Sequence, residues 1–426
     1  MLNRRDFQTW LGAGAVGCLV GLPGAPNAAA EPAKPRKRIA FIGTVLTNLS
    51  HTQHFFDRLM LGYTWKGGWQ EPRLEMAGVH IAQFPEKDDL GRARLQRYGL
   101  TNSASVREAL TLGGRDLAVD GVVVIGEHGE YPENELGQTL YPRYKWFKEI
   151  VEVFEASGRS VPVFNDKHLS TDWSECREMV ADAERLKFPL HAGSSLPVTR
   201  RLPEIEMPWG ADLRESVCVA YGGIDSYDFH ALETAQCMSE RRRGGEVGIQ
   251  SVLALRDEKV WEHLSAQDRA RTRRLFVAAL TRSHNLPVDG GYPTNPVTFD
   301  WARKALPKII GYFIQHRDGF QTAVFMTGIR DFNYAGALGD KEVMSCQFYL
   351  PMPGRGATTA DFFNPLVRYL ESTILDSRPP YPIERTLLTS GMTIAAVQSL
   401  HAGNEVVTPD MDIRYLAPDE SYFWRD

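Results

Sequence analysis

The chain is organised around one stretch, Val161-Pro162-Val163-Phe164-Asn165-Asp166-Lys167-His168-Leu169-Ser170. The apolar residues 161–164 predict a short buried strand. Residues 165–168 are polar, and a helical pattern opens at Ser170. Ligands of α/β sheets bind at the carboxyl ends of the strands, so this strand, turn and helix mark a candidate site.

Strands and helices alternate on both sides of this stretch. The run at residues 120–125 is rich in valine and isoleucine, as in strands that are buried on both faces of a parallel sheet. The alternation predicts a Rossmann-like, doubly wound parallel sheet over residues 37–195. Its expected strands are 38–43, 79–84, 120–125, 161–164 and 189–193.

Residues 196–426 follow a different pattern, in which strands succeed one another with fewer helices between them. The expected strands are 212–220, 247–256, 308–316, 321–328 and 342–350. The expected helices, besides one after the glycines at 222–223, are 265–283, 361–375 and 383–402. This pattern predicts an α+β domain with an open, mostly antiparallel sheet and helices on one face.

Composition is that of an ordinary globular protein, with 43% hydrophobic and 24% charged residues. The formal net charge of −5 offers no basic field to nucleic acid, which is therefore not an expected partner. Cys176, Cys218, Cys237 and Cys346 are widely spaced and form no CxxC motif, which favours buried free thiols. One disulfide is the alternative in an exported protein.

The first 30 residues have the features of a targeting peptide. Asn3-Arg4-Arg5-Asp6-Phe7 resembles the twin-arginine export motif, and small residues at 27–30 offer a cleavage site. The apolar segment 10–22 is too short to span a bilayer well, so stable membrane insertion is not expected. Cys18 leaves lipidation open, but soluble export to the periplasm or another extracytoplasmic compartment is favoured.

The flanks of the central stretch carry a family resemblance. Ser157-Gly158-Arg159 precedes the strand, and Asn165-Asp166-Lys167-His168 follows it. This arrangement resembles the Gfo/Idh/MocA oxidoreductases, whose corresponding turn has the motif Glu-Lys-Pro. Lys167 occupies the position of the family's lysine. Asp166 occupies the position of its glutamate, and His168 that of its proline. The resemblance covers roughly residues 38–415, and it implies a carbohydrate substrate and a homo-oligomer formed through the outer face of the second sheet.

The resemblance also implies a nicotinamide cofactor, NAD or NADP, at the first strand. The family has G-x-G-x-x-G there, whereas this chain has Gly43-Thr44-Val45-Leu46-Thr47-Asn48. Val45 places a branched side chain where backbone should approach a phosphate. Glu86 is a displaced substitute for the acidic residue that holds the ribose. The expected cofactor-binding residues are Gly43, Thr44, Glu86, Glu127, His128 and Asp166.

The second domain supplies the expected catalytic imidazole. A helical pattern after Gly222-Gly223 carries His230 and Glu233, where the family has His-x-x-Asp. Residues three apart share a helix face, so Glu233, or alternatively Asp228, is expected to orient His230. The resemblance implies that Lys167 binds a substrate hydroxyl and that His230 takes its proton. The two terminal nitrogens should then lie within about 10 Å of each other.

The leading hypothesis is an exported oxidoreductase that moves a hydride from a sugar, glycoside or cyclic polyol to nicotinamide. One alternative is a nucleotide-independent, metal-assisted sugar lyase or hydrolase. Its metal-capable residues would be Glu127, His128, Asp166, His168, His230 and Glu233. The other alternative is a non-catalytic carbohydrate-binding protein on the same scaffold, which the degenerate glycine motif favours.

Overall fold

The first sheet consists of five parallel strands in the order β4-β1-β5-β6-β7. The structure is a computed structural model that describes residues 35–287, 297–351 and 360–425, so the expected export signal and Cys18 lie outside it. The strands are β1 (Arg38–Val45), β4 (Glu75–Gln83), β5 (Gly121–Ile125), β6 (Val163–Asp166) and β7 (Leu190–Gly193). An isolated parallel bridge adds Asn102 beside Val79 of β4. This order puts the topological switch point between β1 and β5, and it confirms the predicted Rossmann-like sheet.

Alternate residues of β1 face two different cores. Ile39 and Phe41 belong to one apolar cluster, and Ala40 and Ile42 to another. The first face is covered by α1 (His51–Leu61), α2 (Gly91–Tyr98) and α10 (Phe363–Asp376). The second is covered by α3 (Val106–Thr111), α4 (Arg143–Ser157) and α5 (Trp173–Leu186). Because both faces are covered, the central strands β1 and β5 are mostly apolar.

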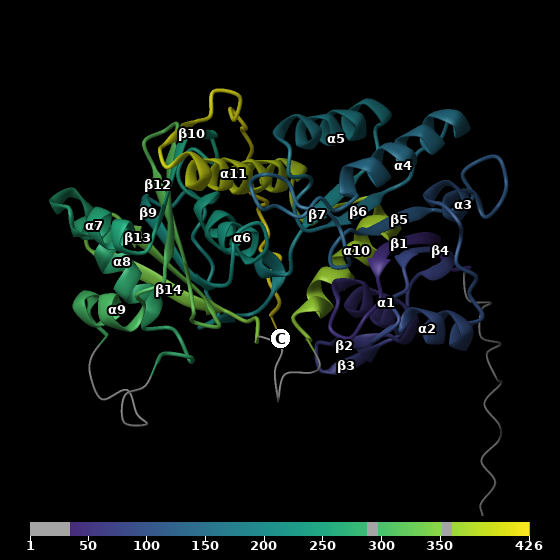
Figure 1. Ribbon diagram of the computed structural model, residues 1–426, viewed down its shortest axis with the longest axis horizontal. Coiled ribbons are helices and arrows are strands. Elements are labelled where there is room, and N and C mark those ends of the chain that lie inside the picture. Colours follow the sequence, from purple (N-terminus) through teal and green to yellow (C-terminus); the bar gives the residue numbers. More distant parts are fainter. Residues whose placement is uncertain (1–34, 288–296, 352–359, 426) are drawn as a thin grey trace, which may run out of the picture. The chain divides into compact units, whose positions relative to one another are not determined.

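Helix α10 packs against the first sheet although chain order assigned it to the second domain. It lies beside α1 and β6 (Figure 1). Gly121 of β5 allows the close approach, since a Cβ there would lie 2.7 Å from the Ile374 side chain. The predicted boundary between residues 195 and 196 therefore does not describe this helix.

The second sheet has eight strands in the order β15-β10-β11-β12-β9-β13-β14-β8. Only β9 and β12 pair in parallel, which confirms an open, mostly antiparallel sheet. The strands are β8 (Arg201–Leu202), β9 (Leu213–Tyr221), β10 (Ile249–Arg256), β11 (Ile310–His316), β12 (Gln321–Thr327), β13 (Phe332–Leu338), β14 (Glu342–Phe348) and β15 (Val406–Val407). Strand β13 was not predicted, because its alanines and Gly336 have low strand propensity.

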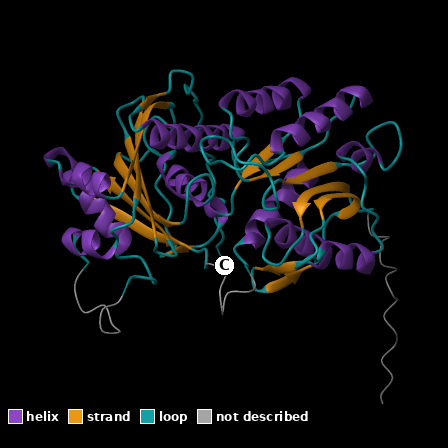
Figure 2. Ribbon diagram, viewed as in Figure 1, coloured by secondary structure: helices purple, strands orange, loops and turns teal. Residues whose placement is uncertain are grey.

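Helices cover both faces of this sheet, so the prediction of helices on one face is wrong (Figure 2). One face packs against α6 (Tyr227–Ser239) and α11 (Ile383–Ala402). The other packs against α7 (Glu258–Ser265), α8 (Ala270–Leu280) and α9 (Phe299–Ala305). The physical reason is that β9 is apolar on both sides: Cys218 faces the first set of helices and Val219 the second. The outer face expected to form the oligomer is thus covered over its central strands.

Smaller features complete the fold. The residues after α1 form a hairpin of β2 (Tyr63–Trp65) and β3 (Gly68–Gln70). The four cysteines within the described ranges are buried free thiols, as predicted. No helix in the described part of the chain combines the length and apolar character needed to cross a bilayer.

Candidate active site

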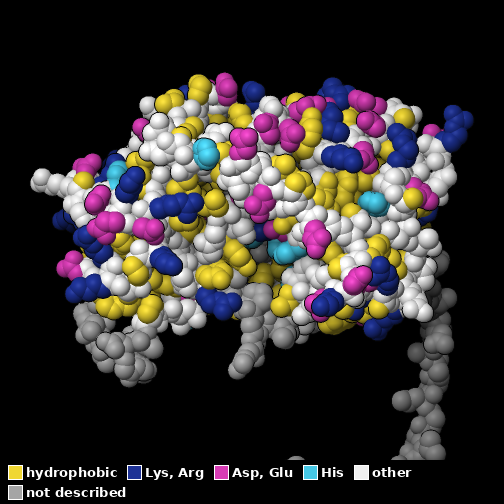
Figure 3. Space-filling view, viewed as in Figure 1, with side chains coloured by type: hydrophobic (Ala, Val, Ile, Leu, Met, Phe, Trp, Pro, Cys, Tyr) yellow, Lys and Arg dark blue, Asp and Glu magenta, His cyan; other side chains and the backbone are white. Residues whose placement is uncertain are grey.

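Four loops meet at the carboxyl ends of β1, β5 and β6 and at the start of α6. Each carries a non-glycine residue in the left-handed region: Leu49 (φ 63°), His128 (φ 68°), Lys167 (φ 70°) and Asp225 (φ 50°). Such backbone costs on the order of 1 kcal/mol per residue and is typical of functional sites. Figure 3 shows a hollow near the middle of the displayed face, with histidine and charged side chains at its edge.

An ionic cluster forms the floor of the site. Glu127 accepts a hydrogen bond from Arg143 at 2.9 Å, and its other oxygen lies 3.5 Å from the Lys167 ammonium. All three side chains are at least nine-tenths buried. Burial alone would raise the pKa of Glu127, but the charges of Lys167 and Arg143 hold this pKa well below its usual range. Glu127 is therefore a fixed anion that positions two cations.

Lys167 and His230 approach the same aromatic ring. The Lys167 ammonium lies 5.9 Å from the centre of the Tyr227 ring, and the His230 ring centre lies 5.8 Å from it. Burial, and then the charge of Lys167, lower the pKa of His230 well below its usual value. The fold thus brings two residues that are far apart in the chain to the same aromatic ring. His230 is neutral there, and its Nδ1 is buried without a partner in the described structure.

A second histidine lies at the start of α1, where sequence reasoning had assigned no site residue. His51 Nδ1 is 2.6 Å from a carboxylate oxygen of Asp166. The His51 ring centre lies 5.3 Å from that of His128 and 6.4 Å from that of His230. Within the described ranges, no group of three or more His, Cys, Asp or Glu side chains is placed to share a metal ion.

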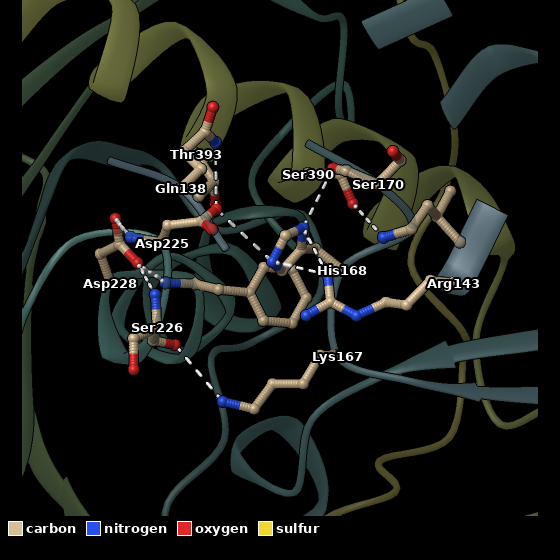
Figure 4. A network of polar contacts seen from close by, with 12 residues as sticks. Gln138, Arg143, Lys167, His168, Ser170, Asp225, Ser226, Asp228, Ser390 and Thr393 are labelled. Carbon is tan, nitrogen blue, oxygen red and sulfur yellow. Dashed lines mark hydrogen bonds and ion pairs between the residues drawn. The ribbon is translucent and has the colours of Figure 1, made fainter. Parts of the chain in front are cut away.

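A buried polar network connects this site to the second domain (Figure 4). Arg143 bonds the carbonyl of Gly126 at 2.9 Å and the His168 ring at 2.9 Å. His168 Nε2 lies 3.6 Å from Asp225, which also accepts a bond from Gln138 at 3.1 Å. Burial raises the pKa of Asp225 to about 7. His168 is therefore part of the link between domains.

Neither predicted carboxylate orients His230. Glu233 accepts hydrogen bonds from the backbone N–H and the hydroxyl of Ser194, at 2.7 and 2.6 Å. Asp228 accepts from backbone N–H groups of its own turn and from the Tyr312 hydroxyl. Both are fully buried, because α6 is enclosed by the rest of the protein, so the hydrogen bonds that they accept come from neighbouring protein groups. The expectation that either holds the imidazole is not met.

The expected cofactor residues divide into two groups. Gly43 is packed against Thr52 of α1, since a Cβ would lie 2.7 Å from its methyl group, and the buried Thr44 hydroxyl donates to the carbonyl of Glu127. Glu86 instead lines an open cleft of about 1090 Å³ beyond the ends of β1 and β4. The cleft reaches Gly129, beside His128, and its lining also includes Thr47, Asn48 and Lys87.

The loop after β1 differs from a phosphate-binding glycine loop. The N–H groups of Thr47 and Gln53 donate to the Ser50 hydroxyl, each at 3.2 Å. The N–H of Leu49 donates to the side chain of Gln53 at 2.5 Å. These bonds cap the start of α1, where a dinucleotide pyrophosphate otherwise accepts from backbone N–H groups. The cleft fits a nucleotide in volume and in its acidic Glu86, and phosphate contacts would come from Asn48 and Lys87.

The residues that sequence reasoning missed are His51, Arg143 and Tyr227. His51 follows directly after the β1 loop, a position that the strand-end rule could have marked. Arg143 and Tyr227 begin helices and had no recognisable spacing to the other residues.

Replacing Glu233 by glutamine should make the protein more stable in alkaline solution. Burial raises the pKa of Glu233 to about 7, so the folded state holds its proton more tightly than the unfolded chain does. The stabilisation is present below the ordinary pKa of 4.5 and is lost as pH rises through 7. We therefore compare the change in the free energy of unfolding that Glu233→Gln causes at pH 8 with the change that it causes at pH 4. We expect the change at pH 8 to be more stabilising, by on the order of 2 kcal/mol.

Urea unfolding of the Glu233→Gln variant and the unsubstituted protein at both pH values checks this. Glu262→Gln, at an exposed position of α7, is the matched control. Equal effects of the Glu233 substitution at the two pH values would contradict the expectation.

Comparisons with known proteins agree with the architecture. No protein-family model matches the chain, and no curated protein matches it significantly. Among solved structures, GenD2 from gentamicin A biosynthesis, in complex with NAD, superimposes with a TM-score of 0.54 at 14% identity, covering 91% of this chain and 99% of that one. The scyllo-inositol dehydrogenase from Lactobacillus casei has a TM-score of 0.50 at 9% identity, covering 87% and 98%. The chain is similar to both of these structures in fold.

Proposed function

We propose that the chain is an NAD(P)-dependent oxidoreductase of the Gfo/Idh/MocA type that acts on a hydroxyl group of a sugar, glycoside or cyclic polyol. The observation that carries this proposal is the convergence of Lys167 and His230 on the Tyr227 ring. This pair lies near His128, next to the nucleotide-sized cleft that reaches Gly129. Similarity in fold to GenD2, whose structure is a complex with NAD, supports the same assignment.

Each residue has a proposed role. The Lys167 ammonium binds the substrate oxygen and stabilises the negative charge that develops there. The neutral His230 forms a hydrogen bond to the same or a neighbouring hydroxyl. Glu86 would accept bonds from ribose hydroxyls, and Asn48 and Lys87 would contact phosphate. When bound, the nicotinamide supplies a two-electron acceptor for hydride.

Calorimetric titration with NAD(H) and NADP(H) tests the cofactor directly. We expect saturable binding of at least one of them, weakened about tenfold by Glu86→Gln because a charge-assisted hydrogen bond is lost. Glu152→Gln, at an exposed position of α4 outside the cleft, should leave the affinity unchanged. No binding at millimolar concentration would overturn the nucleotide-dependent function.

A second candidate function is proton-transfer chemistry on a sugar without a nucleotide, as in a lyase. The specific observation that favours it is the loop before α1 and the capped start of that helix, where the N–H groups of Thr47, Leu49 and Gln53 are already bonded within the chain. Turnover of a sugar by protein that binds no nucleotide would select this candidate. Binding of sugar without any turnover would instead select the carbohydrate-binding alternative.

Export and assembly are proposed on separate grounds. The pattern in residues 1–30 supports export by the twin-arginine pathway to a periplasmic or extracytoplasmic location. The family resemblance supports a homo-oligomer. Because α7, α8 and α9 cover the central outer strands of the second sheet, the contact between copies would use another surface.

A further inference from the structure

Asp166 has one side-chain partner in the described structure, the imidazole of His51. Asp166 ends β6 and its side chain is 1% exposed, whereas that of His51 is 15% exposed. One oxygen of Asp166 lies 2.6 Å from His51 Nδ1, and the other is buried without a partner in the described ranges. A desolvated carboxylate with a single partner binds that partner strongly.

This contact determines which nitrogen of His51 carries a proton. A carboxylate accepts, so Nδ1 of the neutral ring is the donor and Nε2 keeps its lone pair. The backbone N–H of His51 is directed to His128 Nδ1 at 3.5 Å, which helps to fix the start of α1. His51 Nε2 has no hydrogen-bond partner among the described residues and is not one of their buried unpaired atoms. It is thus open to a ligand.

The other imidazoles around His51 are poor proton acceptors. Burial is the main cause that lowers the pKa of His54 to about 3 and that of His128 to about 4, and it holds the pKa of His230 well below its usual value. None of these three rings has a hydrogen bond to a carboxylate in the described structure. The groups that face His51 are Asp166 at the end of β6, Lys167 directly after it, Glu127 and His128 after β5, His230 of α6, His54 of α1 and the Phe363 ring of α10.

We propose that His51, oriented by Asp166, receives the proton of the substrate hydroxyl in this site. The substrate O–H bond breaks as the N–H bond forms at Nε2, and the electron pair stays on the oxygen beside the Lys167 ammonium. Asp166 then stabilises the imidazolium without accepting its proton. His230 is left to hold the substrate by hydrogen bonding. The identity of the substrate rests on the proposed function, whereas the geometry of the pair does not.

Nitrogen-15 NMR of the imidazoles, recorded without nucleotide or substrate, tests the pair independently of activity. We expect His51, assigned by its loss in His51→Gln, to be the Nδ1–H tautomer in the unsubstituted protein. In the Asp166→Asn variant a substantial fraction of His51 should be the Nε2–H tautomer. The asparagine amide can donate a hydrogen bond to Nδ1, which then carries no proton of its own. His401→Gln, at an exposed position of α11, is the control and should leave these signals unchanged.

Kinetics test the proton-accepting role. We expect kcat to fall at least about 100-fold in His51→Ala and in Asp166→Asn, and added imidazole to restore part of the activity of His51→Ala alone. Unchanged nucleotide affinity and circular dichroism show that the variants are folded.

Two results would overturn the inference: an Nε2–H tautomer in the unsubstituted protein, or a His51→Ala variant that keeps kcat within threefold. Absence of nucleotide binding and turnover in the unsubstituted protein would instead overturn the proposed function, and the tautomer would still decide whether the pair exists.

Discussion

Replacement of Lys167 by methionine is expected to lower kcat about 100- to 1000-fold, the usual effect of removing a group that stabilises developing charge on a substrate oxygen. Methionine has nearly the length of lysine but no charge. The ammonium lies 3.5 Å from Glu127 and 5.9 Å from the centre of the Tyr227 ring, in a side chain that is 5% exposed.

Steady-state turnover of the sugar or polyol that the unsubstituted protein oxidises measures this effect. Lys145→Met on α4 is the matched control, because the Lys145 side chain is 76% exposed and its ion-pair partner is Glu149 of the same helix. Nucleotide affinity should change less than kcat. A Lys167→Met variant with more than a tenth of the original kcat would show that Lys167 only supports the structure.

Replacement of Arg143 by methionine is expected to lower the free energy of unfolding by about 3 kcal/mol or more, because it removes one partner of a buried ion pair. Arg143 is 2% exposed, and its guanidinium bonds Glu127, the carbonyl of Gly126 and the His168 ring. Without it the Gly126 carbonyl is left buried and unpaired, and Glu127 keeps only Lys167. Methionine retains much of the apolar packing of the arginine side chain, so the decrease in the free energy of unfolding measures mainly the lost polar contacts.

Urea unfolding at pH 7 gives this value. Arg185→Met on α5 is the control, since Arg185 is 51% exposed although it also contacts two carboxylates. Surface pairs of that kind contribute at most about 1 kcal/mol. A similar loss in both variants, or a loss below 1 kcal/mol for Arg143, would contradict the expectation.

The predicted strands of the first domain are observed with boundaries shifted by a few residues. Buried parallel strands have continuous apolar runs, and a short run of β-branched residues such as Gly121–Ile125 is typical of such a strand. The strand-end rule also located Lys167, Asp166, Glu127 and His128, because the ends of parallel strands meet at one edge of a sheet. Strand β13 and the helices α7 and α9 were not predicted, since their short, mixed sequences have no clear period.

The partners of these residues could not be predicted in the same way. Asp166 was expected at the cofactor, and the structure shows its side chain bound to His51, the first residue of α1. Glu233 was expected at His230, but it binds Ser194, because α6 is enclosed and offers no solvent to its polar groups. A spacing of three on a helix gives a shared face but does not say which neighbour lies against it.

By itself the sequence determined the fold class, the order of the strands in the first domain and the edge of the sheet at which polar side chains gather. These follow from periodicity and from the turn residues between apolar runs, which are local properties. The tertiary structure decided that α10 returns to the first sheet, that α7, α8 and α9 cover the outer face of the second, and that His51 meets Asp166. Those contacts join residues far apart in the chain, and they depend on which surfaces are apolar and close enough to pack, information that no local pattern carries.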